Sequence, residues 1–467
     1  MRIKTPVGAY KKPYAAVQEV TNYYAEKSEQ RARGDVILVP SPGHERAATL
    51  TTGGRALYEF DGALFAVTDT DLVSINDSDA VTTIGAIAAG EVSIANNTTQ
   101  MIIVIGGTVS FLDSYFIVTG RNVTAGYLYT TSGGLVSITD PDFPTGDLTD
   151  QFYVSNLADG SAWEALDYAS AEGSPDFIVG HTVSHREAIF LGQKSLEYFG
   201  NSGNVDFAFS RRDGTFQERG CSAERSIASL DNTTFFLGND RVVYKLLEYR
   251  PQRVSDHAIE RTLEVASKDD IAAARGWSYT QEGHYFYVLT VGDTTMVYDA
   301  TTSALMQGAV WYTWTAADGT GPYPIQFYAK AYGSHYGLDV DGGLFRLKTD
   351  VFTQDSADVT RIATVGPMTL DSRRVSCRRL ALVCTTGTTQ DLTEDPEMVL
   401  TVSRDGGRTW GEPKVRSLGM TGEYTTDLTW RRLGNCSGRT GYAFRFQTTF
   451  GGNIQLHDVD ADFAVAP

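Results

Sequence analysis

Short apolar segments alternate with polar or glycine-containing turns along most of the chain. Each repeated unit consists of a turn, a strand of apolar and aromatic residues, a second short turn and another strand, a pattern typical of β-hairpins. The clearest units span residues 55–67, 186–198, 234–246, 284–298 and 335–347. The last three recur at about 50 residues, and the earlier ones fit about 45 if a hairpin at 101–111 is counted. This repeat length is typical of four-stranded propeller blades.

A hairpin cannot bury both of its faces alone. Blades packed around an axis cover each other's faces and leave few exposed strand edges. We therefore predict an all-β protein that contains a β-propeller, and the repeats give six blades, with seven as the alternative.

The two ends of the chain differ from the repeats. Residues 1–45 combine mixed charge at 26–33 with a proline-rich end at 39–43, so we predict an extended N-terminal arm. We assign residues 46–365 to the propeller and 366–467 to an additional C-terminal β unit. The sequence leaves open whether that unit is a sandwich or the closing blade. One segment, 267–275, predicts a helix, because Ser267 can cap it and Asp269 and Asp270 favour its positive end.

The composition agrees with short strands and tight turns. The 467 residues include 46 Gly, 24 Tyr and 22 Phe, and 42% of them are hydrophobic. The longest apolar run, 101–105, is far shorter than the roughly 18 residues of a membrane-spanning helix, so we expect no membrane span. The basic N-terminus is not followed by an apolar stretch, and we expect no secretion signal. We predict that the scattered Cys221, Cys377, Cys384 and Cys436 are reduced.

The formal net charge of −18 argues against a surface that grips nucleic acid, which requires clustered lysine and arginine. An acidic wall would let a DNA duplex slide past without sticking. Acidity is also a common means of keeping a protein soluble, so the charge is compatible with a conduit but does not establish one.

One motif is specific. Ser403, Asp405, Gly407, Thr409 and Trp410 fit the Asp-box pattern S-x-D-x-G-x-T-W. In such a motif the aspartate accepts backbone N–H groups, glycine supplies a positive φ and tryptophan packs beneath the turn. We predict a structural hairpin in a propeller or sandwich, and that Trp410→Ala costs about 3 kcal/mol or more.

No residues predict a catalytic, cofactor-binding or metal site. His181 and His185 flank a strand-like segment in which positions four apart lie about 13 Å from each other. The acidic pairs Glu394 with Glu397 and Asp458 with Asp462 lie in polar loop or terminal contexts, where we expect solvated carboxylates. The glycine pairs at 53–54, 133–134 and 342–343 lack the residues of a phosphate cradle and predict hairpin turns.

The Asp-box leaves one enzymatic alternative, a carbohydrate-active or carbohydrate-binding propeller of the sialidase type. Such an enzyme needs an arginine triad for a carboxylate and a tyrosine nucleophile paired with a glutamate, and no such arrangement is recognisable. A third alternative is a propeller that serves as a scaffold for host proteins.

Several stretches strongly resemble one family of tailed-phage virion proteins. They follow the family's order along most of the chain: 22–24, 40–43, 161–179, 186–198, 207–214, 220–221, 297–302 with Trp311, the Asp-box region, 428–434 and 444–446. The family is the tail hub or nozzle of P22-like podoviruses, also called the packaged DNA stabilisation protein. The loops and the C-terminal region depart from the family pattern.

The resemblance implies a non-enzymatic structural protein of the phage tail, made in the host bacterial cytoplasm. Members assemble, usually as hexamers, below the portal and the head-to-tail adaptor, help to retain DNA and conduct it during ejection, and anchor tailspikes or fibres. Some hold a tail needle or plug. DNA would pass through the lumen without sequence-specific binding, and the family implies no catalytic residues and no cofactor.

Two aromatic segments, 308–314 and 320–325, allow two interpretations. They are either anchors at interfaces with other proteins or part of the core between blades, and we favour the core.

Overall fold

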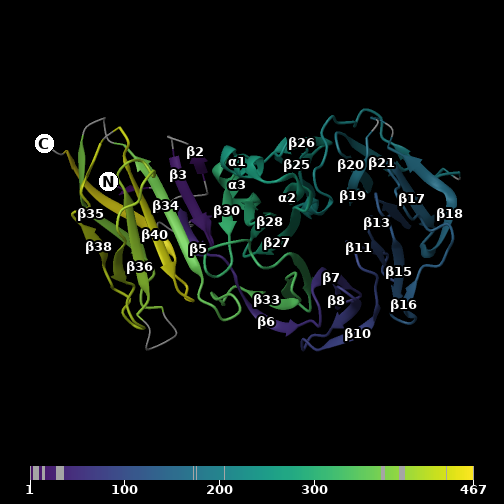
Figure 1. Cartoon of the computed structure of the whole chain (residues 1–467), viewed down its shortest axis with the longest axis horizontal. Helices are drawn as coiled ribbons and strands as arrows, with labels where there is room; N and C mark the ends of the chain where they lie inside the picture. Colours follow the sequence, from purple (N-terminus) through teal and green to yellow (C-terminus); the bar gives the residue numbers. More distant parts are fainter. Residues whose placement is uncertain are drawn as a thin grey trace.

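The computed structural model describes residues 2–3, 10–12, 16–27, 36–171, 173–174, 176–204, 206–369, 374–388, 395–437 and 439–465. The molecule is elongated, with a β-sandwich at one end and a β-propeller at the other (Figure 1). The N-terminal strands β3 (Ala16–Thr21) and β5 (Val36–Pro40) lie between them. The prediction of an all-β protein with a propeller and a C-terminal β unit is confirmed.

The propeller consists of seven four-stranded antiparallel units in the described part of the chain. Blades 1 to 3, each from its first to its fourth strand, are β7 (Gly54–Phe60), β8 (Ala63–Thr68), β9 (Asp71–Ile75) and β10 (Val81–Ala86); β11 (Val92–Asn96), β12 (Met101–Ile105), β15 (Ala125–Thr130) and β16 (Gly134–Ser137); and β13 (Thr108–Leu112), β14 (Tyr115–Thr119), β17 (Gln151–Asn156) and β18 (Asp159–Ser170).

Blades 4 to 7 complete the ring. They are β19 (Ile178–Ser184), β20 (Glu187–Gly192), β21 (Leu196–Asn201) and β22 (Phe209–Arg211); β23 (Ala228–Leu230), β24 (Thr233–Leu237), β25 (Val243–Leu247) and β26 (Arg250–Arg253); β27 (Arg275–Gln281), β28 (His284–Val291), β29 (Thr294–Asp299) and β30 (Trp311–Trp314); and β31 (Phe327–Ala331), β32 (Ser334–Leu338), β33 (Gly343–Lys348) and β6 (Gly43–Thr49).

Contacts between first strands show how the ring closes. β7 contacts β11 and β31, β13 contacts β11 and β19, and β27 contacts β23 and β31. Between β19 and β27 lies the 3₁₀ turn η1 (Glu224–Ser226), which precedes β23. The first strand of each blade therefore lies innermost, and the ring is closed by β6, an N-terminal strand that pairs with β33 of the last blade.

The count of six blades is wrong, and the reason lies at residues 101–111. These residues do not form a hairpin: β12 pairs with β11 and β15 in blade 2, whereas β13 pairs with β14 in blade 3. After β14 the chain returns to complete blade 2 and then completes blade 3. Blades 2 and 3 are thus interleaved in sequence, so a count of successive hairpins merges two blades into one.

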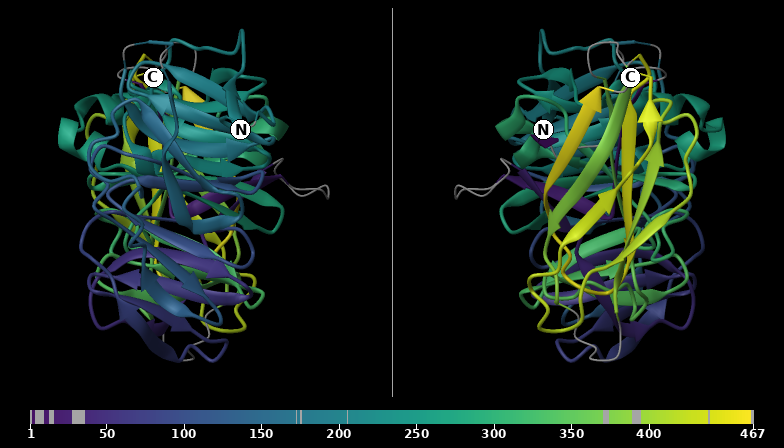
Figure 2. Two further views of the ribbon diagram at one scale, coloured as in Figure 1. Left: turned by 90° about the vertical axis from the view of Figure 1, so that its right-hand side faces the viewer. Right: turned by 90° about the vertical axis from the view of Figure 1, so that its left-hand side faces the viewer.

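The C-terminal unit is a β-sandwich, which settles the alternative left open by the sequence. One sheet contains, in order, β38 (Leu428–Arg431), β35 (Val375–Cys384), β41 (Leu456–Val465), β5 and β4 (Tyr23–Lys27), with β1 (Arg2–Ile3) on β41 and β39 (Asn435–Cys436) on β35. The facing sheet contains β3, β34 (Thr360–Met368), β40 (Tyr442–Thr449), β36 (Glu397–Ser403) and β37 (Lys414–Ser417), with β2 (Tyr10–Lys12) on β3. The turned views show these long strands across one end of the molecule (Figure 2).

The sandwich and the propeller share one sheet and one core. β3 pairs with β34 on one side and, in parallel, with β30 of blade 6 on the other, so a ten-stranded sheet runs from the propeller into the sandwich. The largest cluster of buried apolar residues spans both domains, from Tyr279 and Trp314 in blade 6 to Trp430 and Phe446 in the sandwich. The extended N-terminal arm therefore joins the two domains.

Three short α-helices connect strands around blade 6. Helix α2 (Lys268–Ala272) begins as predicted, with Ser267 as its N-cap and Asp270 completing a capping box. It is shorter than the predicted segment because β27 already starts at Arg275. Two further helices, α1 (His257–Val265) and α3 (Ala300–Met306), were not predicted from the sequence. Among the described residues, no helix combines the length and the apolar character needed to cross a membrane.

Candidate functional site

The Asp-box forms the turn between β36 and β37 of the sandwich. Asp405 accepts hydrogen bonds from the backbone N–H groups of Arg408 at 3.0 Å and Thr409 at 2.9 Å, and from the Thr409 hydroxyl at 2.6 Å. Ser403 donates its hydroxyl to Asp405 and accepts the Gly407 N–H at 2.8 Å. Burial alone would raise the pKa of Asp405, but the hydrogen bonds from Thr409, Ser403 and Arg408 bring it down to about 2.

Trp410 is less buried than expected. Its side chain is half-buried, with the Arg445 guanidinium 4.3 Å from its ring centroid. Arg445 also contacts Glu19 at 3.1 Å and so links the motif to the N-terminal strand β3. The expected cost of at least 3 kcal/mol for Trp410→Ala assumed a buried ring, so we expect a smaller cost for this half-buried side chain.

The two acidic pairs do not form a common site. Glu394 lies outside the described residues, and Glu397 is exposed at the start of β36. On β41, Asp462 is exposed, but Asp458 is buried at 3% exposure, so the expectation of a solvated carboxylate is wrong for Asp458.

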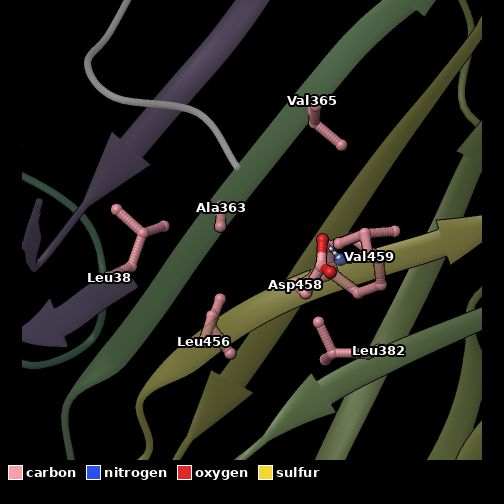
Figure 3. Close-up of a pocket in the computed structure, with 8 residues that line it drawn as sticks. Leu38, Ala363, Val365, Leu382, Leu456, Asp458 and Val459 are labelled. Atoms are coloured by element: carbon pink, nitrogen blue, oxygen red, sulfur yellow. Dashed lines mark hydrogen bonds between the residues drawn. The ribbon is translucent and has the colours of Figure 1, made fainter. Parts of the chain in front are cut away.

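Asp458 lies in a small pocket between the two sandwich sheets, and its carboxylate accepts the N–H of Val459 at 2.9 Å (Figure 3). The pocket is otherwise apolar and is lined by Leu38, Ala363, Val365, Leu382, Phe446, Leu456 and Val459. One carboxylate among apolar side chains offers no second acid or base for hydrolysis.

His181 and His185 contact different residues and do not form a joint site. His181 on β19 is buried, stacks on Phe190 and shares a 2.7 Å hydrogen bond with Ser110; burial lowers its pKa to about 3. His185 lies in the following turn and contacts Ser184 and Asn232. In the part of the chain that the structure describes, no three histidine, cysteine or acidic side chains are grouped as metal ligands. The four cysteines are free thiols.

The aromatic segments belong to the core. Trp311, Tyr312 and Trp314 in β30 are fully buried, as are Tyr323 and Ile325 in the following loop. The interpretation of these residues as anchors for other proteins is therefore wrong, and the core interpretation that we favoured is confirmed.

The most specific polar arrangement lies where the N-terminal strands join the two domains. His284 Nδ1 lies 2.9 Å from Asp299 Oδ2, and both side chains are buried. The hydroxyls of Thr302, at 2.7 Å, and Tyr312, at 3.2 Å, also donate to Asp299. The same two hydroxyls reach the backbone of Ala25 in β4. Tyr312 accepts the Ala25 N–H at 3.0 Å, and the Thr302 hydroxyl lies 3.0 Å from the Ala25 carbonyl, so that its single proton can be donated either to this oxygen or to Asp299. This network ties blade 6 to the arm and, through it, to the sandwich.

A second feature that the sequence analysis missed is an exposed strand edge. β18 is the outermost strand of blade 3, and between the Tyr153–Tyr168 and Ser155–Trp163 pairs it places residues 164–167 opposite Val154 alone. The bulge carries Leu166, a residue that is 83% exposed. An exposed aliphatic side chain on a free strand edge is a candidate contact for another protein.

The fold and these sites define a two-domain structural protein, in which a propeller and a sandwich share a continuous sheet. Two family models match nearly the whole chain. One is described as bacteriophage P22 Gp10, beta-propeller, and covers residues 14–351; the other is described as bacteriophage P22 Gp10, beta-sandwich, and covers residues 362–462. The chain belongs to the bacteriophage P22 Gp10 family and is a structural component of a phage tail. The resemblance drawn from the sequence is confirmed.

Solved structures show only distant similarity. The computationally designed Ika8 protein is 10% identical in sequence. The similar region spans 71% of this chain and 99% of the Ika8 chain, with a TM-score of 0.34. PorZ of Porphyromonas gingivalis is also 10% identical. The similar region spans 79% of this chain and 46% of the PorZ chain, with a TM-score of 0.35. BamB from Moraxella catarrhalis is 11% identical. The similar region spans 64% of this chain and 98% of the BamB chain, with a TM-score of 0.32. A search of curated proteins found no match.

Proposed function

We propose that copies of this chain form a closed ring, with six copies the expected number, that serves as the nozzle of a short phage tail. In this function the ring retains the genomic DNA in the capsid and conducts it during ejection. The observation that carries the proposal is the family match over both domains, 14–351 and 362–462, in one order.

The connection between the domains supports a role under mechanical load. The propeller and the sandwich are joined by paired strands, a common apolar core and the buried network around Asp299, rather than by a flexible linker. A subunit built in this way holds its outer surfaces at fixed positions. Heterologous contacts between such subunits close into a ring when the rotation between neighbours fits the symmetry.

The charge agrees with a conduit. A chain with a net charge of −18 presents few sites for counterion release from DNA, so a duplex in the lumen would be repelled rather than held. We therefore expect passage of DNA without sequence-specific binding.

The proposed partners are the head-to-tail adaptor below the portal, tailspikes or tail fibres, and a tail needle or plug. We propose that the protein is made in the host bacterial cytoplasm and acts without enzymatic activity. The division into an arm at 1–45, a propeller at 46–365 and a C-terminal unit at 366–467 is likewise a proposal; β34 already joins the sandwich sheet from Thr360.

Electron microscopy of the purified chain, alone and mixed with its adaptor ring, tests the proposal. Six-fold rings with a channel wide enough for duplex DNA would support it, and discs that ignore the adaptor would contradict it. Leu166→Asp on the β18 bulge is an informative variant, with Val340→Asp as a matched change of another exposed aliphatic residue, 50% exposed in wild type. Loss of rings in the first variant alone would place the bulge in a contact between copies.

A further inference from the structure

Charged residues from several blades gather at one end of the propeller axis. Arg55 is the second residue of β7, Glu91 directly precedes β11, and Arg275 is the first residue of β27. Glu224 and Arg225 form the turn η1 ahead of β23. Because the first strands lie side by side around the axis, their beginnings meet at the same end of the ring. Ion pairs and hydrogen bonds between these segments confirm that residues far apart in sequence lie together here.

Two arginines hold the carboxylate of Glu91. Arg225 Nη2 lies 2.6 Å from Glu91 Oε2, and Arg275 Nη2 lies 3.4 Å from Glu91 Oε1. The Glu91 side chain is 60% exposed, whereas those of Arg225 and Arg275 are only 19% and 23% exposed. Glu91 thus lies on the solvent side of two guanidinium groups that the fold has already positioned.

The positions of the arginines are fixed by other bonds. Arg55 donates from Nε to the Thr68 carbonyl at 2.6 Å and from Nη1 to the Ala88 and Gly90 carbonyls at 2.8 Å. Arg275 also lies against the ring of Phe327 in blade 7 at 5.0 Å. Even so, Arg55 Nη2 and Arg275 Nη1 are buried without a hydrogen-bond partner. The chain itself therefore leaves part of the hydrogen-bonding capacity of these two arginines unused.

Three acidic side chains, Glu91, Glu224 and Asp69, lie near the three guanidinium groups. Burial lowers the pKa of Arg55, and it lowers that of Arg275, with the nearby Arg225 adding to both effects. Burial raises the pKa of Glu224, which lies near Arg225 and whose carboxyl accepts the Thr108 hydroxyl at 3.0 Å. Glu91 is the exposed acidic side chain that pairs with two of the arginines, so an anion from solvent would compete with its carboxylate.

We propose that Arg55, Arg225 and Arg275 form a binding site for a phosphate-type oxyanion at the propeller axis. The anion enters from the side on which Glu91 is exposed and replaces or adjoins the Glu91 carboxylate. Phosphate suits the site because its several oxygens can accept from forked guanidinium donors on different sides, whereas the two oxygens of Glu91 engage only two arginines. The inference does not depend on ring formation or on the proposed nozzle function.

Isothermal titration of inorganic phosphate into the full chain tests this site, with sodium chloride used to keep the ionic strength constant. We expect saturable binding to wild type and about tenfold or greater weakening in Arg275→Gln, because a charge-assisted hydrogen bond is lost. Arg186→Gln is the matched control, since the Arg186 side chain is 83% exposed in blade 4 and should leave binding unchanged. Glu91→Gln should tighten binding, because the competing carboxylate loses its charge.

If Arg275→Gln weakens the fold, thermal unfolding with and without phosphate, at a constant ionic strength set by sodium chloride, provides a second measurement. Arg225→Gln then provides a second variant, and a phosphate-dependent rise in Tm that is present in wild type and absent in the variants would support the site. Absence of any phosphate effect in wild type, or an equal effect in Arg275→Gln, would overturn the proposal and leave the cluster as a structural plug. A thymidine oligonucleotide without terminal phosphate separates the sources: binding of this phosphodiester alone would also overturn the proposal.

Discussion

Asn22 and Thr315 exchange two hydrogen bonds at the junction of the propeller and the sandwich. The Thr315 N–H donates to Asn22 Oδ1 at 2.9 Å, and Asn22 Nδ2 donates to the Thr315 hydroxyl at 2.7 Å. Asn22 Nδ2 also reaches the Thr360 carbonyl at 2.9 Å, next to the start of the sandwich strand β34. One fully buried side chain between β3 and β4 thus bonds to both domains.

Asn22→Ala should destabilise the chain by about 3 kcal/mol, because it leaves buried groups of Thr315 and Thr360 without a partner. Asn22 has φ = 56°, a conformation that costs alanine about 1 kcal/mol. Asn22→Gly should therefore cost less than Asn22→Ala by about that amount. Chemical denaturation measures both variants, and equal stability of Asn22→Ala and wild type would refute this role of the junction.

The nearly isosteric substitution Asp299→Asn should destabilise the fold, because it changes one acceptor in a buried network. Asp299→Asn weakens the interaction with His284 and replaces one acceptor oxygen by a donor that faces other donors, so we expect a loss of about 3 kcal/mol in the free energy of unfolding. Asp293→Asn is the control, since it makes the same change at an exposed position two residues after β28 ends. If both variants unfold alike, the network around Asp299 contributes nothing specific.

The sequence predicted those features that neighbouring residues determine. Alternation within β7–β8 or β28–β29 and the spacing of the Asp-box depend on a few consecutive positions, and both are found where expected. The interleaving of β12 and β13 depends on pairing with strands that come later, which no local pattern encodes. The short helix α3 was not predicted because seven residues show too little periodicity.

The residues of the arginine cluster could not be recognised from local sequence patterns. Arg55, Glu91, Arg225 and Arg275 are spread over more than half of the propeller sequence, and each is unremarkable by itself. Their common signal is a charged residue at the beginning of an innermost strand, which becomes readable only after the blades have been assigned. The prediction for Asp458 was wrong because its acidic neighbours indicated an exposed position. Instead, its position on the strand places Asp458 in the interior.

The passage between the interleaved blades predicts a sensitive glycine. Gly106 has φ = 78°, and a Cβ added there would lie 1.8 Å from the Asn122 carbonyl oxygen. Gly106→Ala should therefore cost more than about 3 kcal/mol, through strain in φ together with displaced backbone. Gly134→Ala isolates the first effect, because Gly134 has φ = 68° with nothing within 4 Å, and should cost about 1 kcal/mol. Similar losses in Tm for the two variants would argue against a close passage at Gly106.

The Asp-box should confer a stability that depends on pH. The folded-state pKa of Asp405 is lowered to about 2, below the value of an unfolded aspartate, so the charged form stabilises the fold. That contribution is fully present above about pH 4 and is lost as the pH falls toward 2. The difference in Tm between wild type and Asp405→Asn should accordingly shrink over this interval. A difference that stays constant would show that the carboxylate charge does not hold the turn.

Trp410 tests how much of the motif's stability comes from its contact with Arg445. Because the ring is half-buried, Trp410→Ala should cost about 1 to 2 kcal/mol, which combines partial packing with a cation–π contact of about 0.5 to 1 kcal/mol. Trp410→Leu keeps apolar bulk and should lose mainly the second part. In a double-mutant cycle with Arg445→Met, the coupling energy should lie near the cation–π value, measured by urea denaturation. A coupling near zero, with a loss of 3 kcal/mol for Trp410→Ala, would instead restore the original expectation of a buried tryptophan beneath the turn.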